Sequence, residues 1–97
     1  MVERNVRHRR REIDLVVRRG TMVAFVEVKG RRGGEKGDPL EAITARKRRE
    51  IEAVARWWVA RHGREGELYR FDAVAVRASR RGAVAVEHVE GAWFLGE

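Results

Sequence analysis

Three residues in the first third of the chain, Asp14, Glu27 and Lys29, have the types and the spacing to do chemistry together. They stand in the segments Glu-Ile-Asp-Leu (12–15) and Val-Glu-Val-Lys (26–29), where apolar residues surround them. Ionised groups among apolar positions are costly unless a charged ligand or a metal ion keeps them there. The order Asp…Glu-x-Lys is the one that metal-dependent nucleases use to cut phosphodiester bonds, so the spacing predicts a hydrolytic metal site.

Two adjacent strands should position these side chains. Residues 12–18 alternate in the period of a strand, residues 22–29 are rich in β-branched and aromatic side chains, and Arg19-Gly20 between them predicts the turn. A turn centred there places Glu12 opposite Glu27 and Asp14 opposite Phe25. Asp14 and Glu27 are then diagonal neighbours, roughly 5–8 Å apart at the backbone.

The same register sorts the residues of the two strands onto two faces. The four charged residues Glu12, Asp14, Glu27 and Lys29 should share one face. The opposite face should pack against a helix, since it gathers apolar residues, namely Ile13, Leu15, Ala24, Val26 and Val28.

The predicted cofactor is Mg²⁺ or Mn²⁺, held by Asp14 and Glu27 with the backbone carbonyl of Val28 as a possible further ligand. Such an ion can acidify a bound water and offset charge on a phosphoryl transition state. Lys29 could orient the attacking water or stabilise negative charge, and Glu12 is a further ligand or a supporting group. A solvent-facing surface with Glu27–Lys29 ion pairs is the alternative that the spacing leaves open.

Downstream, the pattern predicts a Gly-rich loop over 30–37, a helix from the capping sequence Asp-Pro-Leu-Glu (38–41) to His62, and strands over 68–78 and 83–89. Thr44 and Lys47 should share one helix face near the site. The candidate nucleic-acid contacts are Arg31, Arg46 and Arg48, with a solvated surface as the alternative for the helical arginines. The apolar tail Ala-Trp-Phe-Leu (92–95) should dock on the body or on a partner.

Composition predicts one domain over residues 1–97 and a nucleic-acid partner, most simply DNA. The formal net charge is +7, and 22 of the 97 residues are Lys or Arg, mostly arginine, whose planar fork suits phosphate. No apolar run approaches the roughly 20 residues of a membrane helix, no signal peptide is recognisable, and there is no cysteine. We therefore expect a cytoplasmic protein without a membrane partner, and a chain this short makes a homodimer plausible.

Five segments together resemble a known family. They are Glu-Arg-Asn-Val-Arg (3–7), Glu-Ile-Asp-Leu-Val (12–16), Phe-Val-Glu-Val-Lys-Gly-Arg (25–31), Glu-Ala-Ile-Thr-Ala-Arg-Lys (41–47) and Arg-Phe-Asp-Ala-Val-Ala-Val (70–76). Their order is similar to that of the YraN-like uncharacterised bacterial proteins, a group related to Holliday junction resolvases and the PD-(D/E)xK nucleases.

The resemblance implies an α/β fold with a restriction-endonuclease-like core, in which a mixed central sheet has flanking helices. It implies Asp14 and Glu27 as metal ligands, Lys29 as the catalytic lysine, and supporting roles for Thr44 and Lys47. It suggests a metal-dependent endonuclease acting on DNA, possibly branched or single-stranded. Because the family itself lacks a settled activity, a catalytically inactive nucleic-acid-binding module or a dimeric assembly module that docks through Trp93 is the alternative.

Two departures from the family pattern bear on these expectations. Members usually begin with a helix carrying a Gly-Glu pair, and the sequence given starts after it. Either the start codon was chosen too late or the helix is absent, and in the second case we expect its loss to uncover apolar sheet surface and favour self-association. Arg11 stands where the family typically has glycine, and it adds a bulky cation beside the site.

Overall fold

The structure, a computed structural model, describes residues 1–32, 43–78, 81–82 and 84–95, with residues 31 and 32 described by their backbone alone. Within these ranges five strands and one helix follow one another along the chain. Their order is β1 (Val2–His8), β2 (Arg11–Arg19), β3 (Met22–Arg32), α1 (Ala45–His62), β4 (Leu68–Ala78) and β5 (Val84–Phe94).

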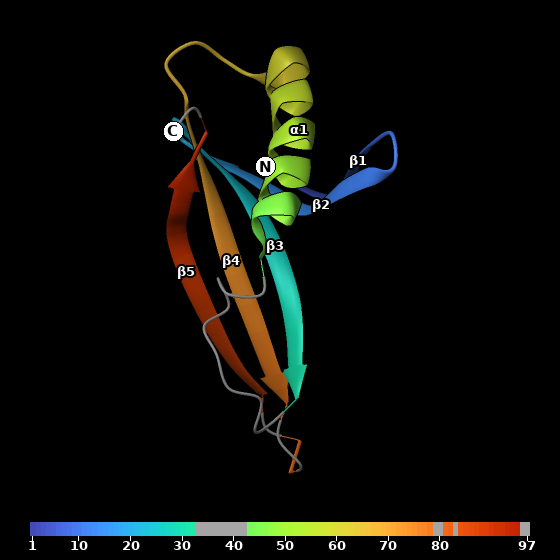
Figure 1. The fold of residues 1–97 in the computed structure, drawn as a ribbon. Coiled ribbons are helices and arrows are strands. Elements are labelled where there is room, and N and C mark those ends of the chain that lie inside the picture. The colour runs from blue at the N-terminus through green and yellow to red at the C-terminus, as the bar shows by residue number, and fades with distance from the viewer. Residues whose placement is uncertain (33–42, 79–80, 83, 96–97) are drawn as a thin grey trace.

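The strands form a single mixed sheet in which the spatial order follows the sequence order. β3 and β4 are parallel, whereas the other three neighbouring pairs are antiparallel. A parallel pair requires a crossover connection, and α1 lies in it. The helix crosses one face of the sheet, and the tip of the β1–β2 hairpin extends beyond it (Figure 1). This α+β architecture confirms the predicted mixed sheet with a flanking helix and is compatible with a nuclease-like core.

The β2–β3 register differs from the predicted one by a shift of two residues. Arg19 pairs with Met22, so the turn consists of Gly20 and Thr21, and Val16 rather than Asp14 faces Phe25. Gly20 has φ +59°, the conformation that a tight hairpin turn of this kind requires at its first central residue. Because side chains alternate with a period of two, a shift of two residues keeps the side chains of the paired residues 15–19 and 22–26 on their predicted faces. The ladder stops at Leu15, and Ile13 before it packs in the same core cluster as Val16 and Val54, not on the face predicted for it.

β1 is a strand that the sequence analysis did not predict. Its arginine-rich sequence shows little apolar alternation, but it pairs with β2 at the edge of the sheet, where polar side chains are favourable. The pairing is interrupted at Asn5, which has φ +52°. On either side of the interruption, Val6 pairs with Ile13 and Glu3 with Val16, and both Ile13 and Val16 are completely buried.

α1 begins at Ala45 rather than at the predicted capping sequence, which lies outside the described residues. Ile43 and Thr44 precede the helix, and the Thr44 hydroxyl accepts a hydrogen bond from the Lys47 amide at 3.1 Å as the N-cap. The helix ends at Gly63 as predicted. A Cβ on Gly63 would lie 2.6 Å from the Val59 carbonyl oxygen and 2.7 Å from the Tyr69 hydroxyl, so close packing requires glycine there.

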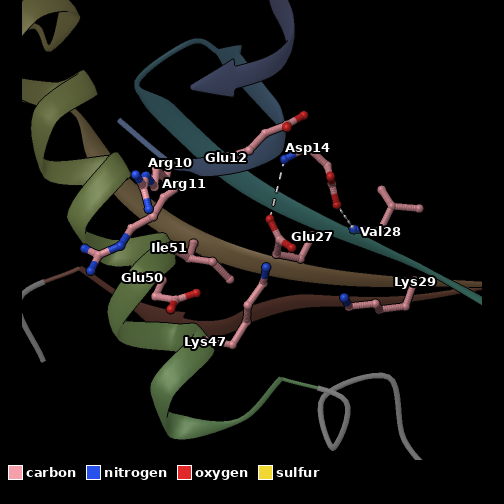
Figure 2. A pocket seen from close by; sticks show the side chains of 10 residues that line it. All are labelled: Arg10, Arg11, Glu12, Asp14, Glu27, Val28, Lys29, Lys47, Glu50 and Ile51. Atoms are coloured by element: carbon pink, nitrogen blue, oxygen red, sulfur yellow. Dashed lines mark hydrogen bonds between the residues drawn. The ribbon is translucent and has the colours of Figure 1, made fainter. Parts of the chain in front are cut away.

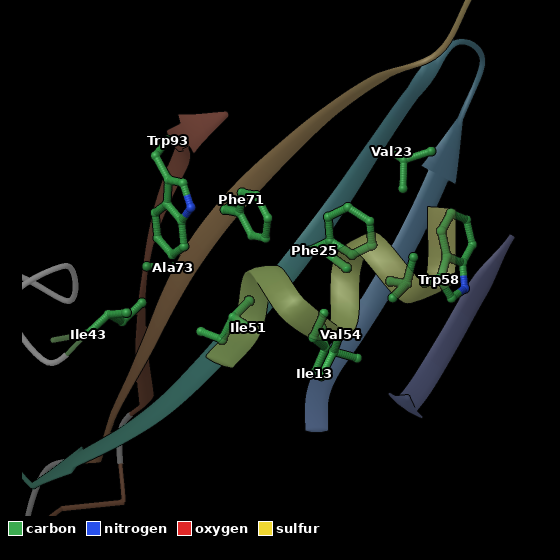
Figure 3. Packing of buried hydrophobic residues seen from close by; sticks show 12 residues of the cluster. Ile13, Val23, Phe25, Ile43, Ile51, Val54, Trp58, Phe71, Ala73 and Trp93 are labelled. Carbon is green, nitrogen blue, oxygen red and sulfur yellow. The ribbon is translucent and has the colours of Figure 1, made fainter. Parts of the chain in front are cut away.

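The helix covers the opposite sheet face from the predicted one. Its buried residues Ile51, Val54 and Trp58 pack on the face that carries Val23 and Phe25, and Trp58 is a core residue as predicted (Figure 3). The prediction was wrong because β3 is buried on both sides, with Ala24 and Val26 each only 6% exposed, so its alternation could not identify the helix-bearing face. Glu27 and Lys29 alternate with Phe25 and therefore lie on the helix side of the sheet.

β5 contains the apolar tail, which docks on the body of the molecule. Trp93 stacks on Phe71 with ring centroids 4.7 Å apart. Nearby the β4–β5 register shifts opposite Asp72, and Gly91 takes φ +57° there and donates its amide to the Asp72 carboxylate at 2.9 Å. Arg70 and His88 contact the same carboxylate. Asp72 therefore has a structural role where β4 and β5 shift register.

In the described part of the chain, α1 is not apolar enough to span a membrane.

Candidate active site

The candidate site lies where the hydrogen-bonded ladder between β2 and β3 stops. The last backbone pair is Leu15 with Val26, and beyond it side chains connect the two strands. The Asp14 carboxylate accepts a hydrogen bond from the Val28 amide at 2.8 Å, and the Glu27 carboxylate accepts one from the Asp14 amide at 3.4 Å (Figure 2). Each of the two predicted metal-binding side chains thus accepts a hydrogen bond from the backbone of the other strand.

A groove of about 290 Å³ opens beside these carboxylates, between α1 and the two strands. Asp14, Glu27 and Lys29 all line it, as does Lys47 from the first turn of the helix (Figure 2). Ile51, one turn further along α1, contributes its apolar wall. The structure therefore brings the predicted carboxylates and lysines together, in a groove walled by the helix rather than on an open face of the sheet.

Glu27 has the most perturbed acid–base behaviour in this groove. It is 4% exposed, and burial is the main cause that raises its pKa from 4.5 to about 7, with the nearby Asp14 charge adding to the rise. The pKa is lowered by the positive charges of Lys47 and Lys29 and by the hydrogen bond from the Asp14 amide, but these effects are too small to offset the rise. Glu27 is therefore a buried carboxylate poised to lose its proton when a cation arrives.

The donor set suits a hard dication with few protein ligands. Mg²⁺ is usually bound through one or two carboxylates and keeps several waters, and the groove offers two adjacent carboxylates and room for water. Among the described residues no three carboxylate or imidazole groups come together as a metal site. The described residues of the groove thus fit Mg²⁺ or Mn²⁺.

Glu12 and Thr44 have closer partners than a metal ion. The Glu12 carboxylate lies at the rim of the groove and accepts a hydrogen bond from the Arg7 side chain at 3.0 Å. The Thr44 hydroxyl caps α1. The cap places Lys47 in the first helical turn, so Thr44 acts on the groove by positioning the start of the helix.

The predicted nucleic-acid contacts are dispersed. Arg46 is exposed at the start of α1 and lies 3.6 Å from Glu50, whereas Arg48 packs over the ring of Trp93 at 4.6 Å from its centroid. The Arg31 side chain lies outside the described part of the chain. Arg46 lines a cavity near the site.

Arg10 and Arg11 line the groove. Arg11 was expected beside the site, whereas Arg10 was not predicted there. They belong to the tip of the β1–β2 hairpin, which brings them beside the carboxylates (Figure 2). The arginine run that ends directly before Glu12 was visible in the sequence. Its position beside the site depends on β1, the strand that the sequence pattern did not reveal.

Comparison with known proteins gives this chain a family. A model of the uncharacterised protein family UPF0102 matches residues 1–76. The chain belongs to this family. It is the YraN-like family that the sequence segments predicted, so that prediction is confirmed.

Relatives from several bacteria match almost the whole chain. The UPF0102 protein of Syntrophotalea carbinolica is 45% identical over 94 residues, which cover 96% of this chain and 75% of that protein. Those of Frankia casuarinae and Symbiobacterium thermophilum are each 41% identical over 93 residues, covering 96% of this chain and 79% of the relative. Their names state no activity, so function has to be argued from the groove itself.

Proposed function

We propose that this member of UPF0102 binds nucleic acid and hydrolyses DNA phosphodiester bonds in the groove between α1 and β2–β3. The observation that carries the proposal is the juxtaposition of Asp14 and Glu27, linked across two strands at the end of their ladder and facing the same groove as Lys29 and Lys47. Two carboxylates and two lysines around a water-accessible groove form the donor set that phosphodiester hydrolysis requires.

Each residue would have a distinct role. Asp14 and Glu27 would hold Mg²⁺ or Mn²⁺ through carboxylate oxygens, and the carbonyl of Val28, which also lines the groove, is the candidate backbone ligand. The bound ion would supply charge neutralisation and a more acidic water. Lys29 would orient the attacking water or stabilise the negative charge that develops on the phosphoryl oxygens. Lys47, facing the groove from α1, would bind the phosphate from the opposite wall.

The reaction balances with water as the only other reactant. The oxygen of one water forms a bond to phosphorus, and one bridging phosphorus–oxygen bond breaks. The departing sugar oxygen takes up a proton, and the water loses one. The products are a phosphate monoester end and a hydroxyl end.

The charge distribution and the family resemblance support DNA as the substrate. The chain carries a formal net charge of +7, which favours a polyanion, and the arginines of the hairpin tip lie beside the groove. The resemblance to Holliday junction resolvases favours branched or single-stranded DNA over a continuous duplex.

Cleavage of labelled DNA tests the proposal directly. Wild-type protein with Mg²⁺ or Mn²⁺ should cleave single-stranded, flap or four-way-junction DNA, and EDTA should abolish cleavage. Glu27→Gln and Lys29→Met should each slow the reaction by roughly 10²–10³-fold. Glu65→Gln, at an exposed carboxylate outside the groove, is the matched control and should retain the wild-type rate. Absence of cleavage by the wild type, or full activity of Glu27→Gln, would refute the proposal.

Metal binding can be measured separately from cleavage. Calorimetric titration with Mn²⁺ should detect binding to the wild type and a loss of at least tenfold in affinity for Asp14→Asn, since second-shell changes alone typically cost roughly 10–100-fold. The Glu65→Gln control should bind as the wild type does. Equal affinity of wild type and Asp14→Asn would exclude Asp14 as a ligand.

A dimeric assembly module without catalysis is the second candidate. Three valines are strongly exposed, with Val2 at 60%, Val84 at 64% and Val86 at 63%, and apolar surface of this kind can support association when it is contiguous. Trp93, by contrast, is packed against Phe71 and does not provide the contact. Sedimentation of the wild type and of Val84→Thr/Val86→Thr tests this candidate, which requires a dimer that the double variant weakens.

A further inference from the structure

We propose that the tip of the β1–β2 hairpin, residues 7–11, is an arm that binds the phosphate backbone of a single DNA strand and guides it into the groove. The inference rests on the proposed hydrolytic function in one respect: the strand that the arm guides would be cleaved in the groove. The arm itself is argued from its position, its charge and its backbone conformation.

The arm joins three neighbouring cavities into one basic path. A cavity of about 190 Å³ at the hairpin tip is lined by Arg7, Arg9, Arg10 and Arg11, with Glu12 at its edge. Arg10 and Arg11 continue into the groove that holds Asp14 and Glu27. A third cavity, of about 400 Å³, lies between Arg11 and the arginines of the first turns of α1. Arg11 lines all three cavities and connects them past the carboxylate pair, with Glu12 and Glu50 as the acidic residues of the path outside that pair.

Most of the charge on this arm is available to a ligand. Arg7 is paired with Glu12 at 3.0 Å, whereas Arg9, Arg10 and Arg11 are exposed and have no carboxylate partner within the described ranges of the chain. Unpaired guanidinium groups in a row suit successive phosphates, because each can donate two hydrogen bonds to phosphate oxygens.

The turn at the tip keeps an arginine where glycine would fit better. His8 pairs with Arg11, so Arg9 and Arg10 form a two-residue turn, and Arg9 has φ +60°. The β2–β3 turn has the same length and a φ of +59° at its first central residue, which is Gly20. A non-glycine residue in this conformation is disfavoured, and such outliers point to function. The comparison of the two turns shows that Arg9 is in a conformation that costs stability, which a binding role for its side chain would explain.

Two contacts hold the arm in place against the helix. The His8 ring stacks on Trp57 with centroids 4.6 Å apart, and the Trp58 indole donates a hydrogen bond to the Glu3 carboxylate at 3.1 Å. β1 is therefore fixed to α1 along its length, and the arginines beyond it are preorganised beside the groove. Preorganisation lowers the entropy cost of binding.

The size of the groove favours one strand over two. At about 290 Å³ it lies near the lower end of the range of small-molecule sites, roughly 300–1,000 Å³. A segment of one strand can enter a space of this size, whereas a base-paired duplex cannot unless it opens. Basic grooves that follow the backbone are the usual device for binding single strands.

Binding in EDTA tests the arm without cleavage. Fluorescence anisotropy with a labelled single-stranded oligonucleotide should show tighter binding than with a blunt duplex of the same length. The triple variant Arg9→Gln/Arg10→Gln/Arg11→Gln should lower the slope of log affinity against log salt by roughly two, at about 0.7 per phosphate contact on a single strand. Arg4→Gln/Arg19→Gln/Arg56→Gln is the matched control, because these exposed arginines line none of the three cavities, and its slope should not change.

A single substitution separates binding from folding. Arg9→Gly should raise the melting temperature because it relieves the positive φ, and should also lower the salt slope by about 0.7. Arg19→Gly, in extended strand backbone, is its control and should lower the melting temperature without changing the slope. Equal slopes for arm and control variants, tighter binding of the duplex, or tighter binding of a matched RNA strand would each overturn the inference.

The arm and the hydrolytic activity can fail independently. A wild-type protein that binds single strands through the arm but does not cleave them would refute the hydrolysis and support the arm. A wild-type protein that cleaves, with equal salt slopes in the arm and control triple variants, would refute the arm and support the hydrolysis.

Discussion

A nearly buried glutamate lies beside each end of α1, and the pKa values of the two glutamates shift in opposite directions. At the groove end, the pKa of Glu27 is raised to about 7 by burial and by Asp14. At the other end, the pKa of Glu67 is lowered to about 2, chiefly by its hydrogen bonds with Arg18. The Arg18 guanidinium contacts both oxygens of this carboxylate, at 2.7 and 3.0 Å. We call this second end, formed by Arg18, Glu67 and their neighbours, the clamp.

Burial raises the pKa of both carboxylates, and only Glu67 has partners that outweigh it. Glu67 also accepts hydrogen bonds from the Arg64 amide and the Tyr69 hydroxyl, and Arg18 reaches the His62 carbonyl at the end of the helix. Glu27 faces another carboxylate and has no ion-pair partner in the described part of the chain. The clamp therefore stabilises the fold, whereas the groove costs stability when Glu27 is ionised. Such a cost is typical of sites that await a ligand.

The largest loss of stability is expected when a large side chain is removed from the core beside the clamp. Trp58 is fully buried, contacts Phe25 edge-on and lies beneath the Arg18 guanidinium. Trp58→Ala should lower the free energy of unfolding by about 3–5 kcal/mol, a large share of the total for a small domain. Trp57→Ala, at a half-buried position stacked on His8, is the comparison and should cost less in the same urea titration. Equal losses would contradict a core centred on Trp58.

At the groove end, removing a charge should stabilise the protein. The native pKa of Glu27, about 7, exceeds its ordinary value of 4.5, so the native state binds more protons than the unfolded state between these values. The contribution of protonated Glu27 to the free energy of unfolding should be fully present below pH 4.5 and should be lost as the pH rises through about 7. In EDTA, Glu27→Gln should therefore raise the free energy of unfolding by up to about 3 kcal/mol at pH 8 and should give no gain at pH 4.

Urea titrations of wild type and Glu27→Gln at these two pH values measure the effect. Glu65→Gln, at an exposed carboxylate, should show no such pH-dependent gain. A loss of stability for Glu27→Gln at both pH values would show that the carboxylate is a structural group like Glu67.

The clamp should respond to pH in the reverse sense. Because the pKa of Glu67 is lowered to about 2, its contribution should be present above pH 4.5 and lost as the pH falls from 4.5 to about 2. Glu67→Gln should lower the melting temperature at pH 7, by less than the truncation of Trp58 because glutamine keeps the shape and one acceptor. The difference from wild type should vanish near pH 2. A difference that persists there would show that charge is not the cause.

The sequence revealed the chemistry of the groove more reliably than its surroundings. Asp14, Glu27 and Lys29 reach one groove although the predicted register was wrong. Glu27 and Lys29 keep a common face by strand alternation, and Asp14 reaches it where the ladder has ended, through its hydrogen bond with the Val28 amide. The order of the later elements and the end of the helix at Gly63 followed from periodicity and composition.

Three features could not be read from the sequence, each for a physical reason. β1 lacks an apolar pattern because it is a polar edge strand. The helix-bearing face was ambiguous because β3 is apolar on both sides. The start of the helix was misplaced because two capping signals compete, one at Asp38 and one at Thr44, and no local rule ranks them. All three features depend on tertiary pairing, which also brings the arginine arm to the groove.

The smallest effect expected concerns Thr44, at the groove end of the helix. Thr44→Ala removes the hydrogen bond that the hydroxyl accepts from the Lys47 amide, and it should cost about 1 kcal/mol of stability. Thr44→Ser keeps the oxygen and should cost little. If Thr44 acts only by positioning the first turn, which carries Lys47, then Thr44→Ala should slow cleavage much less than Lys29→Met does. Thr44→Ala could instead lose as much cleavage activity as Lys29→Met while its stability hardly changes. That result would place the Thr44 hydroxyl in contact with the DNA and add it to the carboxylates and lysines that act on the substrate.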